Sequence, residues 1–245
     1  MTALSVNLNK LALLRNSRGR NYPDLLDFAQ RFIAGGAHGL TIHPRPDERH
    51  VRRRDAHALS ELLQDHPGVE FNIEGYPSQE FLQLVAALKP TQCTLVPDAP
   101  GQLTSDHGWN CRTEAAFLAS TVRQLQDHGV RVALFLDPDT DQVQAAATTG
   151  ADRIELYTEA YAQAFGSPTQ AAVLTRYHET ALAAQMAGLG VNAGHDLGLH
   201  NLVAFLTIPE ILEVSIGHAL TVECIELGLD TVLARYLAIC DGERT

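Results

Sequence analysis

The 245-residue sequence has few cysteines, and it lacks the long apolar runs of a membrane protein. Its four cysteines are far apart and form no CxxC pair, which is typical of reduced thiols in the cytoplasm. No apolar run approaches ~18 residues. Residues 1–10 also lack the basic segment and apolar core of a signal peptide. We therefore expect a cytoplasmic protein that makes no membrane contact.

Positive charge is also scarce, because the formal net charge is −11 at pH 7. This balance argues against a general nucleic-acid binder, which needs a basic surface. The distribution is uneven: residues 1–54 contain ten Lys and Arg but four Asp and Glu, a local charge of +6. Such a cluster is usually a solvated surface. It also suits a pocket for a small anion, such as a phosphorylated metabolite.

The chain repeats one pattern, in which a short apolar segment rich in β-forming residues precedes an amphipathic helical segment. The predicted strands are residues 4–8, 40–43, 69–73, 93–96, 130–136, 153–157, 189–193 and 212–216. Eight strands alternating with helices predict a (β/α)8 TIM barrel, here one domain over residues 1–245. The sequence has no GxGxxG after its first strand, as a dinucleotide-binding sheet would, and no fixed leucine period, as a solenoid would.

Polar residues stand at most of the predicted strand ends, where barrel enzymes carry their active sites. They include Asn7, Asn9, His43, Glu74, Glu155, the pair His195 and Asp196, and the pair Gly217 and His218. A single histidine at a strand end is usually structural, whereas a ring of such groups indicates an active site. Histidine and buried glutamate are well suited to proton transfer near neutral pH.

Glycines and arginines near these strand ends point to a phosphate ligand. Gly194 and Gly217 precede histidines at the ends of strands 7 and 8, the usual phosphate site of barrels. The alternative is that these glycines only permit tight turns. Arginines, which match phosphate oxygens well, follow the first two strands: Arg15, Arg18, Arg20, Arg45 and Arg49, with His50 beside them.

The connection over residues 97–111 is unusually long and rich in Pro, Gly and polar residues. Loops of this length are uncommon unless they serve a function, so we predict a lid over the site. Thr104 and Ser105 would contact the substrate from this loop.

Several motifs together resemble the pyridoxine 5′-phosphate synthase family. They are VNLNKLALLRNSRG from residue 6, TIHPRPDERH from residue 41, FNIEG from residue 71, LVPD from residue 95 with QLTS from residue 102, VNAGHDLGLHN from residue 191 and SIGHAL from residue 215. They occur in order and cover nearly the whole chain. The resemblance implies a (β/α)8 barrel with extra helices, assembled as a homo-octamer, that uses neither metal nor organic cofactor. It also implies condensation of 3-amino-2-oxopropyl phosphate with 1-deoxy-D-xylulose 5-phosphate to form the pyridine ring, with release of phosphate and water.

The resemblance also implies roles for individual residues. His43 and Glu74 would be proton acceptors and His195 the proton donor. The aminoketone phosphate would be bound by Asn7, Arg18, Asp196, Gly217 and His218, and the deoxyxylulose phosphate by Asn9, Lys10, Arg45, His50 and Thr104.

The chain departs from the family pattern at two places. Asn9 and Lys10 stand where the pattern has Asp and His, and Asp196 stands where Gly often follows the histidine. A carboxylate would repel a phosphate, so we expect Asp196 to contact it through the backbone.

Two other functions remain open on the sequence. A metal-dependent barrel hydrolase or isomerase would use His43, Glu74, Glu155, His195 and His218 as ligands, although the chain lacks HxH on strand 1 and lacks HExxH. A non-catalytic relative, inactivated by the changes at Lys10 and Asp196, would bind phosphorylated ligands without turnover.

Overall fold

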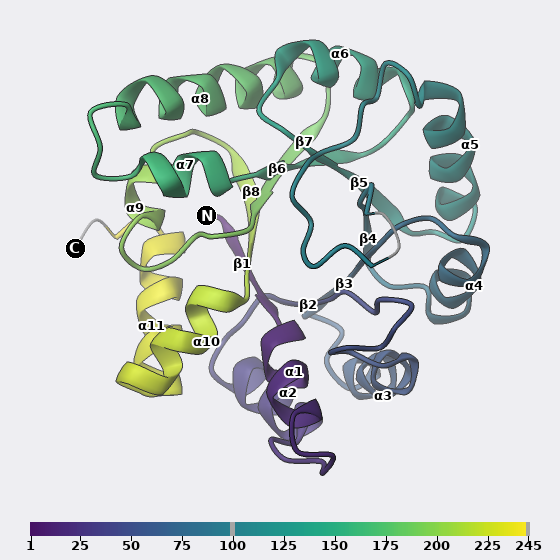
Figure 1. Cartoon of the computed structure of the whole chain (residues 1–245), viewed down its shortest axis with the longest axis vertical. Helices are drawn as coiled ribbons and strands as arrows, with labels where there is room; N and C mark the ends of the chain where they lie inside the picture. The colour runs from purple at the N-terminus through teal and green to yellow at the C-terminus, as the bar shows by residue number, and fades with distance from the viewer. Residues whose placement is uncertain (99–100, 244–245) are drawn as a thin grey trace.

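The computed structural model describes residues 1–98 and 101–243, and its strands close into a parallel barrel (Figure 1). Each strand pairs with the next, and β8 pairs with β1. This confirms the predicted (β/α)8 fold. The strands are β1 (Ala3–Asn7), β2 (Gly39–Ile42), β3 (Glu70–Gly75), β4 (Gln92–Leu95), β5 (Arg131–Leu136), β6 (Arg153–Tyr157), β7 (Gly190–Gly194) and β8 (Ile211–Ile216).

A ring of helices surrounds the barrel. They are α1 (Asn9–Asn16), α2 (Leu25–Ala34), α3 (Arg53–Gln64), α4 (Gln79–Leu88), α5 (Ala115–Gln126), α6 (Thr140–Thr148), α7 (Glu159–Ala164), α8 (Gln170–Met186), α9 (Leu202–Phe205), α10 (His218–Leu227) and α11 (Leu229–Cys240). Side chains of Asp24, Ser78 and Asp139 accept hydrogen bonds from the first turns of α2, α4 and α6. Helices α1, α7 and α10 are additional to one helix per strand, as the predicted extra helices require.

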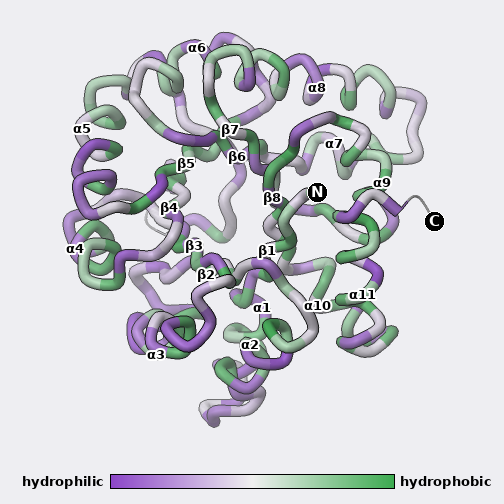
Figure 2. Tube along the Cα trace, turned by 180° about the vertical axis from the view of Figure 1, so that it is seen from behind, coloured by the Kyte–Doolittle hydropathy of each residue, from purple (hydrophilic) through white to green (hydrophobic). Residues whose placement is uncertain are grey.

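The strands are covered on both faces, and the residues that they bury include polar side chains such as Thr41, Gln92 and Thr94. Every residue of β2 and β4 is buried, as expected where helices pack outside and neighbouring strands fill the interior. Seen from behind, the helices alternate between hydrophobic and hydrophilic residues along their turns (Figure 2). At the chain ends, the backbone N–H of Thr2 donates to the carbonyl of Cys240 at 3.0 Å. No helix in the described ranges is both long and apolar enough to span a bilayer.

Helix α1 was not expected from the sequence, which suggested a basic loop after strand 1. Its buried face includes Arg15, whose side chain is 2% exposed and donates to both carboxylate oxygens of Asp55 at 2.8 and 2.7 Å. Because this charged residue stands on the buried face of α1, the apolar pattern that identifies a helix in a sequence is interrupted there. Arg15 is thus a structural ion-pair partner and not a basic group of the site.

Other element boundaries also differ from those expected. Glu74 lies within β3 and not after it, and His43 follows β2 instead of ending it. The helical segment after β8 starts directly at His218, at the strand end, and is divided at Gly228, whose φ is +86°. A residue with this backbone conformation cannot continue an α-helix.

Candidate active site

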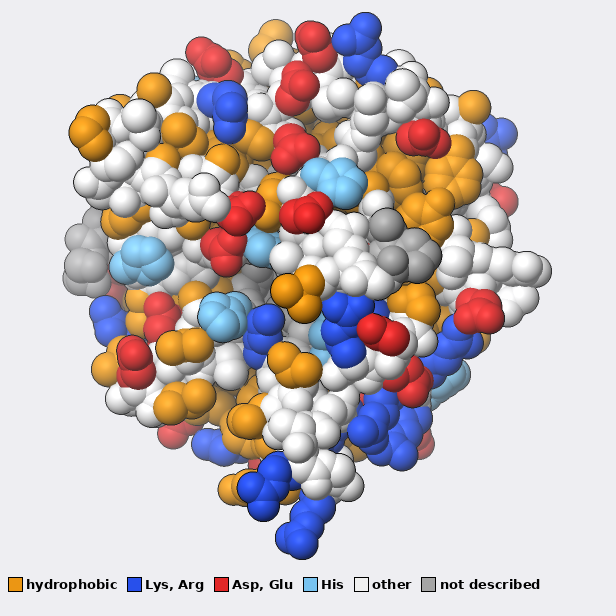
Figure 3. Space-filling model, in the orientation of Figure 1, with side chains coloured by type: hydrophobic (Ala, Val, Ile, Leu, Met, Phe, Trp, Pro, Cys, Tyr) orange, Lys and Arg blue, Asp and Glu red, His pale blue; other side chains and the backbone are white. Residues whose placement is uncertain are grey.

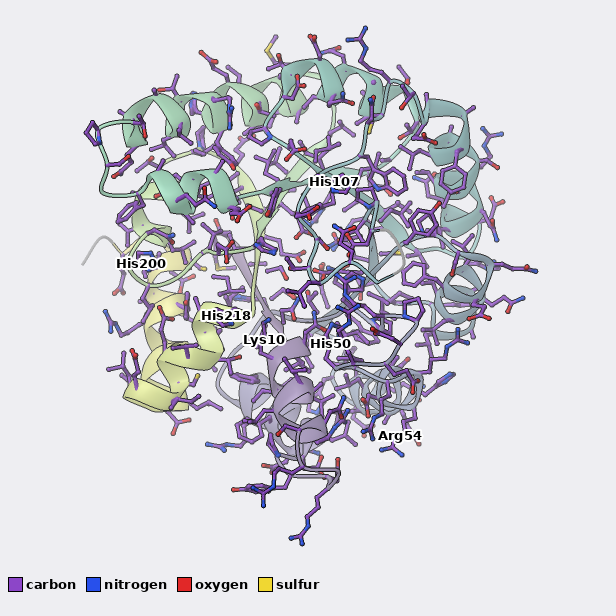
Figure 4. The ribbon with its side chains drawn as sticks, viewed as in Figure 1. Lys10, His50, Arg54, His107, His200 and His218 are labelled. Atoms are coloured by element: carbon purple, nitrogen blue, oxygen red, sulfur yellow. The ribbon has the colours of Figure 1, made fainter. Side chains whose placement is uncertain are left out.

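A cavity of about 470 Å³ opens at the carboxyl ends of the strands. Figure 3 shows this face, with basic, acidic and histidine side chains around its hollowed centre. In Figure 4, Lys10, His50 and His218 lie near one another on this face, whereas Arg54 lies at the periphery. All but one of the predicted site residues line the cavity: Asn7, Asn9, Lys10, His43, Arg45, His50, Glu74, Thr104, His195, Asp196, Gly217 and His218.

His43 and Glu74 lie side by side at the ends of the neighbouring strands β2 and β3. The distance from His43 Nδ1 to Glu74 Oε2 is 3.8 Å, and Asn7 Nδ2 donates to the same oxygen at 3.5 Å. Asn9 Oδ1 accepts the backbone N–H of His43 at 2.9 Å, and the backbone N–H of Asn9 donates to Asn7 Oδ1. The two asparagines therefore connect the start of α1 to the histidine and glutamate.

Burial shifts the protonation of these groups in opposite directions. Desolvation, with the nearby Arg45 charge second, lowers the pKa of His43 well below its usual value. Desolvation, followed by repulsion from Glu155, raises the pKa of Glu74 well above its usual value. Burial also raises the pKa of Glu155 to about 8. A neutral imidazole beside high-pKa carboxyl groups can accept and return protons near neutral pH.

His195 follows β7 and contacts the loop opposite. Its Nε2 is 3.0 Å from the hydroxyl oxygen of Thr104, and its Nδ1 is 2.7 Å from Asp196 Oδ2. The side chain of Asp196 is thus directed toward the histidine ring.

Arg45 and His50, from the connection between β2 and α3, stand on the basic side of the cavity with Lys10 of α1. Arg45 is 7% exposed, and its guanidinium donates to Asp98 Oδ2 at 2.5 Å. The same carboxylate oxygen accepts a hydrogen bond from the hydroxyl of Ser105 at 2.8 Å. Burial lowers the pKa of His50 to about 4, with Arg45 the next cause, so this ring is neutral at pH 7.

Asp98 is a buried carboxylate beside the site to which we assigned no role from the sequence. Its Oδ1 is buried and is the one such side-chain atom without a hydrogen-bond partner in residues 1–98 and 101–243. The available signal was its position in LVPD, shortly after the end of β4 at Leu95.

The predicted lid, residues 97–111, borders the cavity through Leu103, Thr104 and Ser105. Residues 99 and 100 lie outside the described residues. The far end of the loop is anchored by Trp109, whose Nε1 donates to the carbonyl of Leu95 at 2.9 Å.

Gly194 and Gly217 make room for site side chains. A Cβ at Gly194 would lie 2.2 Å from Glu155 Oε1, and a Cβ at Gly217 would lie 3.0 Å from the Cβ of Asn7. Gly217 and His218 also form the start of α10, whose first backbone N–H groups lack helical partners. A helix start that lines a cavity in this way favours an anionic ligand.

Arg18 is the predicted site residue that the structure places elsewhere. It is exposed and does not line the cavity. The connection between α1 and α2, which contains it, projects from the ring in Figure 1, and Figure 3 shows basic side chains on this projection.

The described part of the chain contains no group of three or more His, Cys, Asp and Glu that could hold a metal ion, which the metal-dependent alternative requires. A second cleft, of about 580 Å³, lies beside α6, α7 and α8. It contains none of His43, Glu74 and His195, so the proton-transfer groups belong to the first cavity.

Comparison with known proteins decides the family. Residues 4–242 match the model of the family described as pyridoxal phosphate biosynthesis protein PdxJ. The chain belongs to the PdxJ family. It is 50% identical over 252 residues to pyridoxine 5′-phosphate synthase of Xanthomonas campestris pv. campestris (strain B100), which covers 100% of this chain and 98% of the relative. The Mesorhizobium japonicum synthase is 51% identical, over 97% of this chain and 98% of its own length. These matches confirm the resemblance and the prediction of an enzyme.

Solved structures share the fold at low sequence identity. Phosphoribosylanthranilate isomerase from Thermotoga maritima has a TM-score of 0.61 at 10% identity and covers 99% of this chain and 100% of its own. A tryptophan synthase α-subunit from Pyrococcus furiosus has a TM-score of 0.65 at 11% identity, with coverage of 99% and 98%. These likenesses support the barrel fold of this PdxJ family member and nothing finer.

Proposed function

We propose that the protein is a pyridoxine 5′-phosphate synthase that condenses 3-amino-2-oxopropyl phosphate with 1-deoxy-D-xylulose 5-phosphate. The product is the phosphorylated pyridine ring of vitamin B6, and phosphate and water are released. The observation that carries the proposal is the cavity at the carboxyl ends of the strands, where His43, Glu74 and His195 meet basic groups and a helix start. The reaction of two phosphorylated substrates needs groups that transfer protons and groups that bind phosphate in one cavity.

His43, Glu74 and His195 carry out the proton transfers. The amine condenses with the ketose carbonyl to give an imine, and His43 and Glu74 remove protons to form the enamine that eliminates phosphate. His43 suits this role because its lowered pKa keeps it neutral at pH 7. His195 protonates a departing oxygen. Glu155, whose pKa burial raises to about 8, keeps its proton at neutral pH. Each proton transfer contributes about 10²–10⁴-fold in rate.

The remaining residues bind the two phosphates. Asn7, the backbone at Asp196, Gly217 and His218 hold the aminoketone phosphate at the start of α10. Asn9, Lys10, Arg45, His50 and Thr104 hold the deoxyxylulose phosphate. A phosphate on Arg45 would compete with its present partner Asp98, 2.5 Å away. Substrate binding therefore loosens the contact between Arg45 and Asp98 of the loop over residues 97–111. Released from this contact, the loop is free to close over the substrate as a lid.

Arg18 joins the aminoketone phosphate only if it comes from another copy, because it lies outside the cavity of its own chain. We propose that the enzyme is a homo-octamer in the cytoplasm, in which Arg18 of one copy lies at the cavity of a neighbour.

The test is an assay of the purified protein with both phosphorylated substrates, following pyridoxine 5′-phosphate and released phosphate, with and without a chelator. We expect both products in equal amounts and no effect of the chelator. Loss of activity with chelator would instead support the metal-dependent alternative. Binding of both substrates without any product would support the non-catalytic alternative and overturn the proposal.

A further inference from the structure

The turn after β7 is held in an uncommon backbone conformation. His195 and Asp196 have φ of +77° and +52°, a region that non-glycine residues rarely occupy. The hydroxyl of buried Thr158 donates to the carbonyls of Gly194 and His195, the first at 2.8 Å. Asn201 Nδ2 donates to the carbonyl of Asp196 at 3.1 Å. Such a conformation persists only where its surroundings fix it, and here two buried side chains do so.

This turn brings the carboxylate of Asp196 within hydrogen-bond distance of the His195 ring. Asp196 Oδ2 is 2.7 Å from His195 Nδ1, and His195 Nε2 is 3.0 Å from Thr104 Oγ1 at the cavity. The hydrogen bond from His195 lowers the pKa of Asp196 below its usual value, so this carboxylate is ionised at neutral pH. An ionised carboxylate only accepts, and therefore Nδ1 carries the proton.

The other groups around the ring leave this pairing undisturbed. The ring of Tyr157 meets that of His195 edge to face, with centroids 4.9 Å apart, and its hydroxyl donates to Glu159 instead. Lys10 of α1 and His218 of α10 (Figure 4) face the same carboxylate and favour its charged form. Within residues 1–98 and 101–243, the ring nitrogens of His195 thus hydrogen-bond to Asp196 and Thr104 alone.

We propose that Asp196 is a positioning residue that holds His195 in the tautomer with its proton on Nδ1, so that Nε2 is the atom that serves the substrate. This inference rests on the proposed function, in which His195 is the proton donor. The imidazolium gives its Nε2 proton to the departing oxygen, which keeps the electron pair of the broken C–O bond. The neutral ring that remains keeps the proton on its own Nδ1, hydrogen-bonded to the ionised carboxylate of Asp196, and Nε2 then takes a new proton from solvent.

The discriminating variant is Asp196→Asn. Asparagine occupies the left-handed region readily, so the turn is retained. Its amide N–H group, however, can donate to Nδ1 and select the opposite tautomer. We expect kcat to fall about tenfold or more, with both KM values within about twofold of wild type. The matched control is Asp127→Asn, an exposed aspartate that precedes a histidine at the end of α5, with kcat unchanged.

Nitrogen-15 NMR of histidine-labelled protein at neutral pH reads the tautomer directly, with His195→Gln to assign the signal. We expect the Nδ1-protonated ring in wild type and the Nε2-protonated ring in Asp196→Asn. An unchanged kcat in Asp196→Asn, or one tautomer in both proteins, would overturn the inference. A wild-type protein that forms no product would overturn the proposed function instead, while the NMR comparison would still decide the role of Asp196.

Discussion

The carboxyl group of Glu155 is buried in the barrel, 3% exposed, where its Oε2 accepts a hydrogen bond from Thr94 at 3.1 Å. Desolvation, and then repulsion from Glu213, raises its pKa from 4.5 to about 8. Between these two pH values the folded state keeps a proton that the unfolded state has lost. The stabilising effect of this proton is complete below pH 4.5 and is lost as the pH rises through 8.

We predict that Glu155→Gln removes this pH dependence. The free energy of unfolding of the variant, relative to wild type, should increase between pH 5 and pH 8.5 by on the order of 4 kcal/mol. Urea unfolding at a series of pH values measures this difference. Glu61→Gln, on the exposed face of α3, is the control for loss of one negative charge. A difference that stays constant with pH would contradict the raised pKa.

Single residues were predictable where one rule places them. His43, Glu74 and His195 could be assigned because barrels carry reactive groups at strand ends. The Arg15–Asp55 and Arg45–Asp98 pairs could not be predicted, since their partners are 40 and 53 residues apart in the chain, respectively. No local pattern encodes such a pairing, and so Arg15 was mistaken for a site residue and Asp98 was assigned no role.

Among the elements, β7 has a constraint that its sequence pattern does not reveal. Gly194 pairs with Ser215 at the end of the strand, and its missing side chain makes space for the carboxylate of Glu155. A Cβ there would lie 2.2 Å from Glu155 Oε1, closer than atoms can approach.

We predict that Gly194→Ala lowers kcat/KM at least tenfold, because Glu155 must move within the cavity. The control is Gly68→Ala, where nothing lies within 4 Å of the added Cβ and φ is not positive. Both variants are compared in the two-substrate assay, with circular dichroism to establish that each is folded. Full activity of folded Gly194→Ala would show that the position of Glu155 does not matter.

The strands were predictable as elements and some helices were not. The strands are short segments rich in β-forming residues and bounded by turns, which a sequence displays directly even where buried polar residues such as Gln92 and Glu155 interrupt the apolar run. Helix α1 has only Leu11, Ala12 and Arg15 buried, so its apolar period is weak. The start of α10 is hard to recognise in the sequence because its first residues, His218 and Ala219, line the cavity as well as begin the helix.

Across the whole molecule, the ring of strand ends gathers residues from Asn7 to His218 in one cavity, and of the predicted site residues Arg18 alone lies outside it. The barrel topology brings the strand-end residues together, so the repeat of strands and helices in the sequence was enough to predict that they share one cavity. The position of Arg18 depends on a helix and a connection outside the repeat. Its proposed role therefore requires a second copy of the chain.

Mixed oligomers test this requirement. Arg18→Ala and Glu74→Gln should each have little activity as pure proteins. If Arg18 acts in a neighbouring cavity, some sites of a mixed oligomer combine an intact Glu74 with an intact Arg18. Random mixing after co-expression should then restore about a quarter of the wild-type activity. The control pair, Glu74→Gln with His43→Ala, affects one cavity of the same chain and should restore none. Failure of the first pair to recover, in oligomers shown to contain both chains, would mean that Arg18 has no role in a neighbouring site.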